Sequence, residues 1–266
     1  MTDLSHQAAY IGALNLKGQG FIILGAGGGG MGSQISVALA AAGAELLCVD
    51  FRAEEAEEIA KATGSVAHVA DVTSRAEVEG VVARAVALFG SRFRGVVDIV
   101  GMAMMGAIPS FDDAAIERQF AVVFRHALLA TQIATPALVA NGGGTMVFVG
   151  SISGITGVPN QAIYGAAKAA LHHLVVQAAF EFGPANVRFN AIAPGFVRTP
   201  RLQAMIPEAT WKAIAEGIPL RRVADPSDIA RAALFLASDL SRYVTSNVLT
   251  LDGGATGYVP TPIIKP

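Results

Sequence analysis

Tyr164 and Lys168 stand four residues apart and are the side chains of this sequence best placed for acid–base chemistry. In a helix, residues at that spacing lie on one face, so the phenol and the ammonium would project together. A nearby cation stabilises a phenolate, which predicts a Tyr164 pKa lowered from about 10 toward neutrality and a role as general acid or base. Taken alone, such a pair is more often a solvated surface pair, and the other motifs decide against that interpretation.

A glycine-rich segment at 25–32 is the second chemical candidate, because it follows a short apolar run and opens a helical one. Gly25-x-Gly27-x-x-Gly30, with Met31 next, matches the pattern of dinucleotide-binding loops. Glycines let the backbone approach a pyrophosphate, and a helix N-terminus offers unpaired N–H groups and a partial positive charge. In this setting we expect a dinucleotide site rather than a merely flexible turn.

Two acidic positions refine that expectation. Asp50 ends the second apolar run, twenty residues after Gly30, where a carboxylate can accept hydrogen bonds from both adenosine ribose hydroxyls. It would repel a 2′-phosphate and so favours NAD over NADP, although Arg52 could receive that phosphate. Asp71 and Val72 end the third run and could flank the adenine, while Asp71 could equally cap the following helix.

The scaffold that must position these motifs is indicated by short apolar runs that alternate with longer amphipathic ones. Strands are predicted at 20–25, 44–50, 66–70, 96–100, 145–149, 187–192 and 247–251, and helices at 31–42, 53–63, 75–89, 113–140, 161–183 and 226–238. Continuous apolar strands with helical crossovers predict a doubly wound α/β fold with a parallel sheet covered on both faces. We expect 1–266 to form a single domain, in which 199–219 is either a lid over the site or a surface excursion.

Composition excludes several function classes. The 266 residues are 53% hydrophobic and 15% charged, which predicts a large core and further burial in subunit contacts. A net charge of −2 without a basic run argues against nucleic acid as a partner. Cys48 is the only cysteine, so a reducing, cytoplasmic location fits, and no histidine or carboxylate recurs at metal-ligand spacing. No signal peptide is visible in 1–17, and no apolar run reaches the roughly 18 residues that a membrane span needs.

Together these features resemble the short-chain dehydrogenase/reductase family across nearly the whole chain. The matching features are the glycine loop, Asp50, Asp71-Val72, Asp98, Ser151, Tyr164, Lys168, the segment 190–199 and the segment 251–254. The resemblance implies a seven-stranded Rossmann-type sheet and a catalytic Ser–Tyr–Lys group. By similarity, Tyr164 transfers the proton to or from the substrate oxygen, Ser151 holds that oxygen, and Lys168 lowers the Tyr164 pKa and binds the nicotinamide ribose.

The resemblance also implies a nicotinamide seat and a quaternary structure. The seat would be formed by Pro194, Gly195, Val197 and Thr199. In similar proteins the helices that correspond to 113–140 and 161–183 pack against a second subunit, so we expect a homo-oligomer, a dimer or a tetramer.

Three positions depart from the family pattern. Leu24 stands where the glycine loop usually begins with threonine, and one extra glycine lengthens the loop. Gly-Met-Ala-Met at 101–104 replaces Asn-Asn-Ala-Gly, and Val123 replaces the catalytic asparagine of the long helix. Valine is stiff at χ1 and favours a regular helix over a kinked one. We expect catalysis to survive, because the main-chain carbonyl that helps to hold a water beside the lysine is kept.

The expected function is therefore NAD-dependent hydride transfer with a small-molecule secondary alcohol or its ketone. Apolar residues near the predicted pocket favour a substrate with an apolar ring or chain: Met102, Met104, Met105, Ile152, Ile155, Phe196, Met205 and Ile206. A non-catalytic NAD-binding protein of the same fold is the alternative, and a scaffolding subunit is a weaker one. The histidine pair His172-His173 is expected at a helix edge or in a subunit contact.

Overall fold

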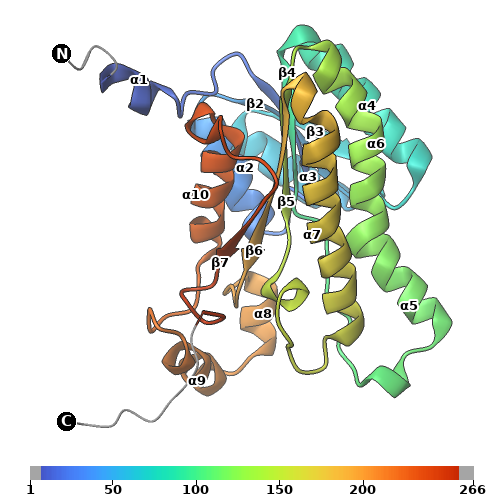
Figure 1. The fold of residues 1–266 in the computed structure, drawn as a ribbon, viewed down its shortest axis with the longest axis vertical. Helices are drawn as coiled ribbons and strands as arrows, with labels where there is room; N and C mark the ends of the chain where they lie inside the picture. Colours follow the sequence, from blue (N-terminus) through green and yellow to red (C-terminus); the bar gives the residue numbers. More distant parts are fainter. Residues whose placement is uncertain (1–6, 258–266) are drawn as a thin grey trace.

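The computed structural model describes residues 7–257 and contains one seven-stranded sheet whose strands are all parallel (Figure 1). The strand order is β3-β2-β1-β4-β5-β6-β7, so the sheet is built outward in both directions from β1 and β4. The strands are β1 Gly20–Leu24, β2 Glu45–Asp50, β3 Val66–Val69, β4 Phe93–Asp98, β5 Gly144–Val149, β6 Val187–Pro194 and β7 Asn247–Leu251. This confirms the predicted doubly wound α/β fold.

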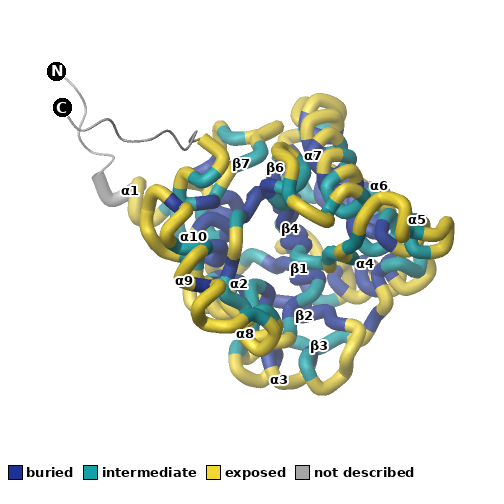
Figure 2. Tube along the Cα trace, turned by 90° about the horizontal axis from the view of Figure 1, so that it is seen from below, coloured by how far each residue is buried: buried dark blue, intermediate teal, exposed yellow. Residues whose placement is uncertain are grey.

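Helices cover both faces of the sheet. The helices are α1 Gln7–Gly12, α2 Met31–Ala41, α3 Ala53–Thr63, α4 Arg75–Phe89, α5 Asp113–Phe120, α6 His126–Ala140, α7 Ala162–Phe182, α8 Pro200–Met205, α9 Glu208–Gly217 and α10 Pro226–Ala237. Helices α4, α6 and α7 pack on one face of the sheet, and α2, α3 and α10 pack on the other. In Figure 2 the central strands are buried, the edge strands β3 and β7 are mostly intermediate, and exposed residues lie on the outer helices and the loops. Two apolar cores therefore hold the sheet in place.

The carboxyl ends of the strands meet at one edge of this sheet. The chain reverses its direction of winding between β1 and β4, and parallel α/β sheets bind ligands in the crevice at such a point. Leu24, Asp50, Asp98, Val149 and Pro194 end five of the strands there. The loops that follow these residues therefore share one side of the molecule.

Two predicted elements differ from the structure near this edge. Strand β4 spans Phe93–Asp98 rather than 96–100, and beyond it the Val100 N–H donates to the Asp98 carboxylate at 3.0 Å. The helix predicted over 113–140 is continuous but contains a π-helical turn, Ala121–Arg125, between α5 and α6. The expectation that Val123 favours a regular helix is therefore wrong. Val123 is fully buried, and its tertiary packing outweighs the local preference of a β-branched side chain.

The segments 199–219 and 113–140 each differ from expectation in another way. The first, for which no helix was predicted, consists largely of α8 and α9. The second, Asp113–Ala140, is the one helical stretch among the described residues that is long and apolar enough to cross a membrane. The mean hydropathy of an 18-residue window is 1.4, and half of that window is buried. This helix contains polar residues, so it is not the uninterrupted apolar run that the sequence lacks. The predicted domain, 1–266, and the segment 1–17, in which no signal peptide is predicted, both extend beyond the described residues.

Candidate active site

The catalytic candidates come together at the end of β5. Ser151 follows that strand and begins a short 3-10 turn, Ile152–Gly154, in which its hydroxyl accepts a hydrogen bond from Ser153 N at 3.1 Å. Helix α7 starts eleven residues after Ser151 and carries Tyr164 and Lys168 on one face. The Lys168 ammonium donates to the Val149 carbonyl at 2.7 Å, which fixes α7 to the strand end. The structure thus brings the three predicted side chains to one place.

Burial dominates the electrostatics of this group. Lys168 is only 2% exposed, and desolvation lowers its pKa to about 8 against an opposing contribution from the Asp98 charge. Burial raises the pKa of Tyr164, and the Ser151 hydroxyl partly offsets that rise. The prediction that Lys168 lowers the Tyr164 pKa is therefore not what the structure gives. The ammonium lies 5.7 Å from the centre of the phenol ring and is directed to Val149.

The glycine loop forms a tight turn between β1 and α2. Gly25, Gly28 and Gly29 have positive φ, and Gly30 is the N-cap of α2, which begins at Met31. A Cβ at Gly32 would lie 1.9 Å from the Gly25 carbonyl oxygen. The loop therefore depends on glycine for its conformation as well as for access to its backbone N–H groups. These features fit a pyrophosphate at the N-terminus of α2.

Asp50 lies against this loop, as predicted. Its 7% exposed carboxylate accepts hydrogen bonds from Gly27 N at 3.0 Å and from Arg52 N at 3.2 Å. The Arg52 guanidinium forms an ion pair with Glu55, and it stacks 5.3 Å from the centre of the Phe51 ring. Glu55 also reaches the glycine loop, since a Cβ at Gly28 would lie 3.1 Å from its carboxylate. The basic residue next to Asp50 is thus already paired with an acid.

The other predicted cofactor residues frame the two ends of the crevice. Val72 is buried in the core after β3. Asp71 is exposed, and its carboxylate accepts a hydrogen bond from Thr73 N at 2.9 Å, which caps a turn. The N-cap of α4 is Ser74 rather than Asp71. On the other side of the crevice, Thr199 is the N-cap of α8, and a Cβ at Gly30 would lie 3.8 Å from the Thr199 Cβ. The segment after β6 therefore closes over the glycine loop.

Pro194, Gly195 and Val197 lead from β6 to that contact. Pro194 is the last residue of β6, and Val197 is 5% exposed and forms an isolated bridge with Ala224. A Cβ at Gly195 would lie 2.9 Å from the Asp252 Cβ, so the chain passes closely over the end of β7. This packing gives the predicted nicotinamide seat a rigid backbone.

Three buried polar residues near the catalytic group were not identified from the sequence. The His126 imidazole contacts the Asp98 carboxylate, with Nε2 to oxygen distances of 3.1 and 3.0 Å. The Gln119 amide accepts from Met104 N at 2.7 Å and donates to the Met102 carbonyl at 2.9 Å. His172 is 7% exposed, so the expectation of an edge position for it is wrong.

His172 supports the backbone around the catalytic serine. Its Nε2 accepts from Ser151 N at 3.4 Å, and burial, then the Lys168 charge, lowers its pKa to about 4. Its neighbour His173 is exposed. The spacing of His172 four residues after Lys168 was the one available signal, because it places both side chains on one side of α7.

Apolar side chains are exposed around the catalytic group. Five of the residues predicted to line the pocket are between 40% and 66% exposed: Met102, Met105, Ile155, Phe196 and Met205. They come from the loops after β4, β5 and β6 and from α8, and the Arg201 guanidinium of α8 contacts the Met102 sulfur. Apolar surface of this kind at the mouth of a crevice is typical of a ligand site.

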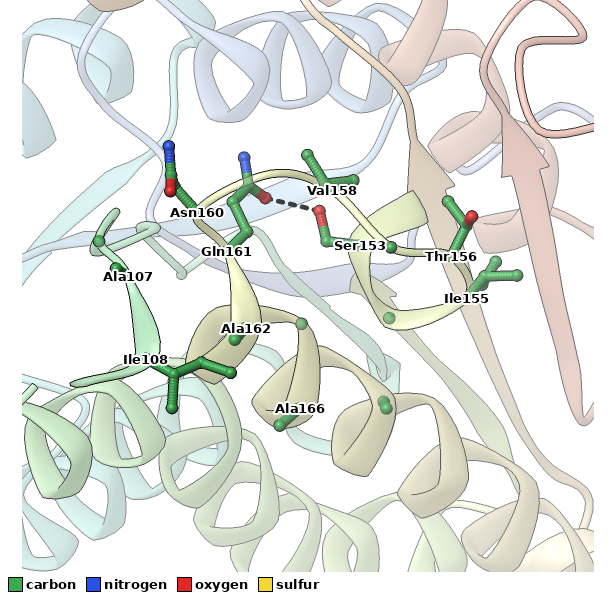
Figure 3. Close-up of a pocket in the computed structure, with 15 residues that line it drawn as sticks. Ala107, Ile108, Ser153, Ile155, Thr156, Val158, Asn160, Gln161, Ala162 and Ala166 are labelled. Carbon is green, nitrogen blue, oxygen red and sulfur yellow. Dashed lines mark hydrogen bonds between the residues drawn. The ribbon is translucent and has the colours of Figure 1, made fainter. Parts of the chain in front are cut away.

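A separate groove of about 590 Å³ lies between the loop 106–108, the loop 153–161 and the start of α7 (Figure 3). The Ser153 hydroxyl donates to the Gln161 amide oxygen at 2.6 Å along its wall. From α7 it is lined by Ala162, Gly165, Ala166 and Ala169, which lie on a different side of the helix from Tyr164 and Lys168. The groove therefore borders the catalytic group without containing it.

Known proteins match both the chain and its fold. A family model described as Enoyl-(Acyl carrier protein) reductase matches residues 25–256. The chain is 34% identical to 7alpha-hydroxysteroid dehydrogenase of Escherichia coli over 249 residues, covering 91% of this chain and 95% of that protein. It is 33% identical to 2-(S)-hydroxypropyl-CoM dehydrogenase 3 of Xanthobacter autotrophicus over 252 residues, covering 91% and 98%.

A solved structure agrees with these matches. 7 alpha-hydroxysteroid dehydrogenase complexed with NADH and 7-oxo glycochenodeoxycholic acid superposes with a TM-score of 0.85 at 31% identity, covering 91% of this chain and 96% of that one. The fold, the crevice and these matches define a nicotinamide-dependent oxidoreductase. The chain belongs to the short-chain dehydrogenase/reductase family.

Proposed function

We propose that this protein is an NAD-dependent dehydrogenase/reductase that interconverts a secondary alcohol and its ketone. The observation that carries the proposal is the convergence of Ser151, Tyr164 and Lys168 beside the dinucleotide crevice. Bound nicotinamide supplies hydride transfer. Tyr164 donates the proton to the ketone oxygen or takes it from the alcohol, Ser151 hydrogen-bonds that oxygen, and Lys168 provides positive charge nearby.

NAD rather than NADP is supported by the charges around the ribose end of the crevice. Asp50 occupies the position where an acid accepts the ribose hydroxyls. Glu55 adds a second carboxylate beside the glycine loop and neutralises Arg52, the residue that could otherwise receive a 2′-phosphate. The related dehydrogenase whose structure contains NADH is consistent with this choice.

The substrate class is supported by the exposed apolar residues at the mouth of the crevice. Burying a methionine or phenylalanine side chain against a ligand contributes about 1.5–3 kcal/mol, so several of them favour an apolar ring or chain. Helices α8 and α9 form the proposed lid, since α8 contacts the loop after β4 through Arg201. Methionines on both sides adapt their shape to different ligands.

Three further parts of the proposal concern the whole protein. We propose that 1–266 acts as a single cytoplasmic domain, that it binds no nucleic acid, membrane or metal, and that it assembles as a homo-oligomer. An apolar stripe on α7 supports the assembly. It consists of exposed residues at helical spacing: Ala162, Ala166, Ala169, Val176 and Phe180.

The test is turnover of a panel of alcohols and ketones, followed by NADH absorbance, together with titration of NAD and NADP. We expect turnover and a lower dissociation constant for NAD. Equal affinity for the two cofactors would mean that Arg52 outweighs Asp50 and Glu55. If the native protein turns over nothing while Val123→Asn does, the chain is a non-catalytic NAD-binding protein, the alternative function.

A further inference from the structure

A buried ammonium needs a compensating charge, and Lys168 has one hydrogen bond to a neutral carbonyl. Moving a charge out of water costs several kcal/mol unless nearby charges or dipoles offset it. The surroundings of Lys168 on the side of the loop after β4 are apolar. A Cβ at Gly101 would lie 2.9 Å from the Lys168 Nζ and 4.0 Å from the Val123 side chain. Neither Gly101 nor Val123 has a side-chain group that could stabilise the charge.

The end of β4 brings a carboxylate to the strand end that holds Lys168. Asp98 pairs in register with Phe148, and the next residue, Val149, accepts from the Lys168 ammonium. Asp98 is 2% exposed and follows Val96 by two positions, so its side chain points to the sheet face covered by α6 and α7. Val100 N donates to one oxygen of this carboxylate at 3.0 Å, and the imidazole of His126, itself 1% exposed, lies 3.1 Å from the same oxygen. The second carboxylate oxygen is buried without a hydrogen-bond partner among the described residues. Asp98 forms no direct ion pair with Lys168, yet its charge raises the Lys168 pKa against desolvation.

We propose that Asp98 is the buried counter-charge of Lys168, and that His126 is the positioning residue that holds the Asp98 carboxylate in place. The pair then keeps the ammonium charged in a place where Val123 contributes no polar group. The inference rests on the proposed function only in treating Lys168 as catalytic. The charge state of Lys168, which the inference concerns, can be measured without turnover.

The other titratable groups around Lys168 do not supply this charge. Tyr164 and His172 lie on α7 together with Lys168. Burial raises the pKa of the Tyr164 phenol, which is therefore protonated near pH 7. His172 has a pKa of about 4 and is therefore neutral near pH 7. His126 on α6 contacts Asp98. Among these groups, Asp98 on β4 is thus the one whose charge favours the ammonium of Lys168. Removing the Asp98 charge takes away the contribution that raises the Lys168 pKa, so this pKa should fall below about 8.

The decisive experiment follows the Lys168 Nζ signal by ¹⁵N NMR as a function of pH, assigned with Lys168→Ala, in the native protein and in Asp98→Asn. The asparagine oxygen can still accept from Val100 N. We expect the Lys168 midpoint to fall by about one pH unit, equivalent to tenfold in the equilibrium. Glu57→Gln removes the same charge from the exposed face of α3 and should leave the midpoint unchanged.

A second pair of variants keeps the test decisive if Asp98→Asn does not fold. His126→Gln retains an N–H donor for Asp98 and should keep the native midpoint, whereas His126→Leu should lower it. Unchanged Lys168 midpoints in both variants overturn the inference. Shifted midpoints in a protein without turnover support it and count instead against the proposed function.

Discussion

At the scale of single residues, proton transfer depends on Tyr164, whose pKa burial raises above its ordinary value of 10. The phenol is therefore protonated near neutral pH and ready to donate to a ketone oxygen. Oxidation of an alcohol requires the phenolate, so its rate should increase as the pH rises, while reduction should not. The opposite pH dependence of oxidation and reduction follows from the acid–base role of Tyr164 alone and does not depend on the substrate.

Replacing that phenol gives the first prediction. Tyr164→Phe should reduce turnover in both directions by about 10²-fold or more, the usual scale for a lost general acid. NAD affinity should stay nearly unchanged, as measured by titration. Tyr243→Phe removes the phenol of a fully exposed tyrosine and serves as the control. Substantial activity in Tyr164→Phe would assign proton transfer to another group.

His172 gives a second prediction, for stability. Its pKa falls from 6.5 to about 4 on folding, so the unfolded chain binds the proton more readily below pH 6.5. The free energy of unfolding should therefore decrease as the pH falls from 6.5 to 4, with an upper limit of about 1.4 kcal/mol for each unit of pKa depression. His172→Gln does not titrate and should show a smaller decrease in urea unfolding measured across this range. Parallel curves for the two proteins would contradict the prediction.

Residue types and spacing identified Ser151, Tyr164 and Lys168 because catalytic groups on one helix and one strand end leave a local signature. The Asp98–His126 contact leaves none, since the two residues are 28 positions apart and only the packing of α6 on β4 brings them together. The predicted direction of the Tyr164 pKa shift was wrong for a related reason. The spacing places Lys168 on the same face of α7 as Tyr164. Its ammonium, however, donates to the Val149 carbonyl, a tertiary contact that the spacing does not predict.

At the scale of elements, Gln119 connects a helix to the loop that carries Met102 and Met104. Gln119→Leu would keep the packing at this 1% exposed position and leave two backbone groups without partners. We expect a loss of about 1–3 kcal/mol in stability, the cost of an unsatisfied buried polar group. The KM for the ketone should rise several-fold, because this loop borders the proposed substrate site.

Thermal unfolding and steady-state kinetics would test this third prediction. Gln132→Leu alters an exposed glutamine on α6 that pairs with Arg75, and should change neither quantity appreciably. A lower stability with an unchanged KM would show that the clamp supports the fold without shaping the substrate site.

Apolar periodicity predicted the type and order of the main sheet and helix elements, because burial on both faces of a parallel sheet dictates it. It did not predict the π-helical turn Ala121–Arg125 or the helices α8 and α9. The turn depends on how Val123 packs against the rest of the site. The helix α9 is short, and its one buried residue, Trp211, gives no repeating pattern to detect.

At the scale of the whole molecule, the distribution of apolar residues determines the fold more clearly than it determines the oligomeric state. Two cores on either side of one sheet account for the apolar residues of the strands, and the sequence pattern was sufficient to predict them. The outer surface of α7 is different. Phe180 is 83% exposed and Val176 is 40% exposed, on a stripe that also borders the groove beside Ser153. Exposed apolar residues on one side of a helix favour association, although the exposed His173 lies between Ala169 and Val176 on that side.

The last prediction concerns that stripe. Phe180→Glu should dissociate the homo-oligomer, because burying a phenylalanine side chain contributes about 1.5–3 kcal/mol and a buried carboxylate would oppose it. Light scattering at micromolar concentration would measure the mass of both proteins. Tyr243→Glu places the same charge at a fully exposed aromatic residue and should leave the mass unchanged. A monomeric native protein would refute the assembly, and an intact oligomer in Phe180→Glu would place the interface elsewhere than on α7.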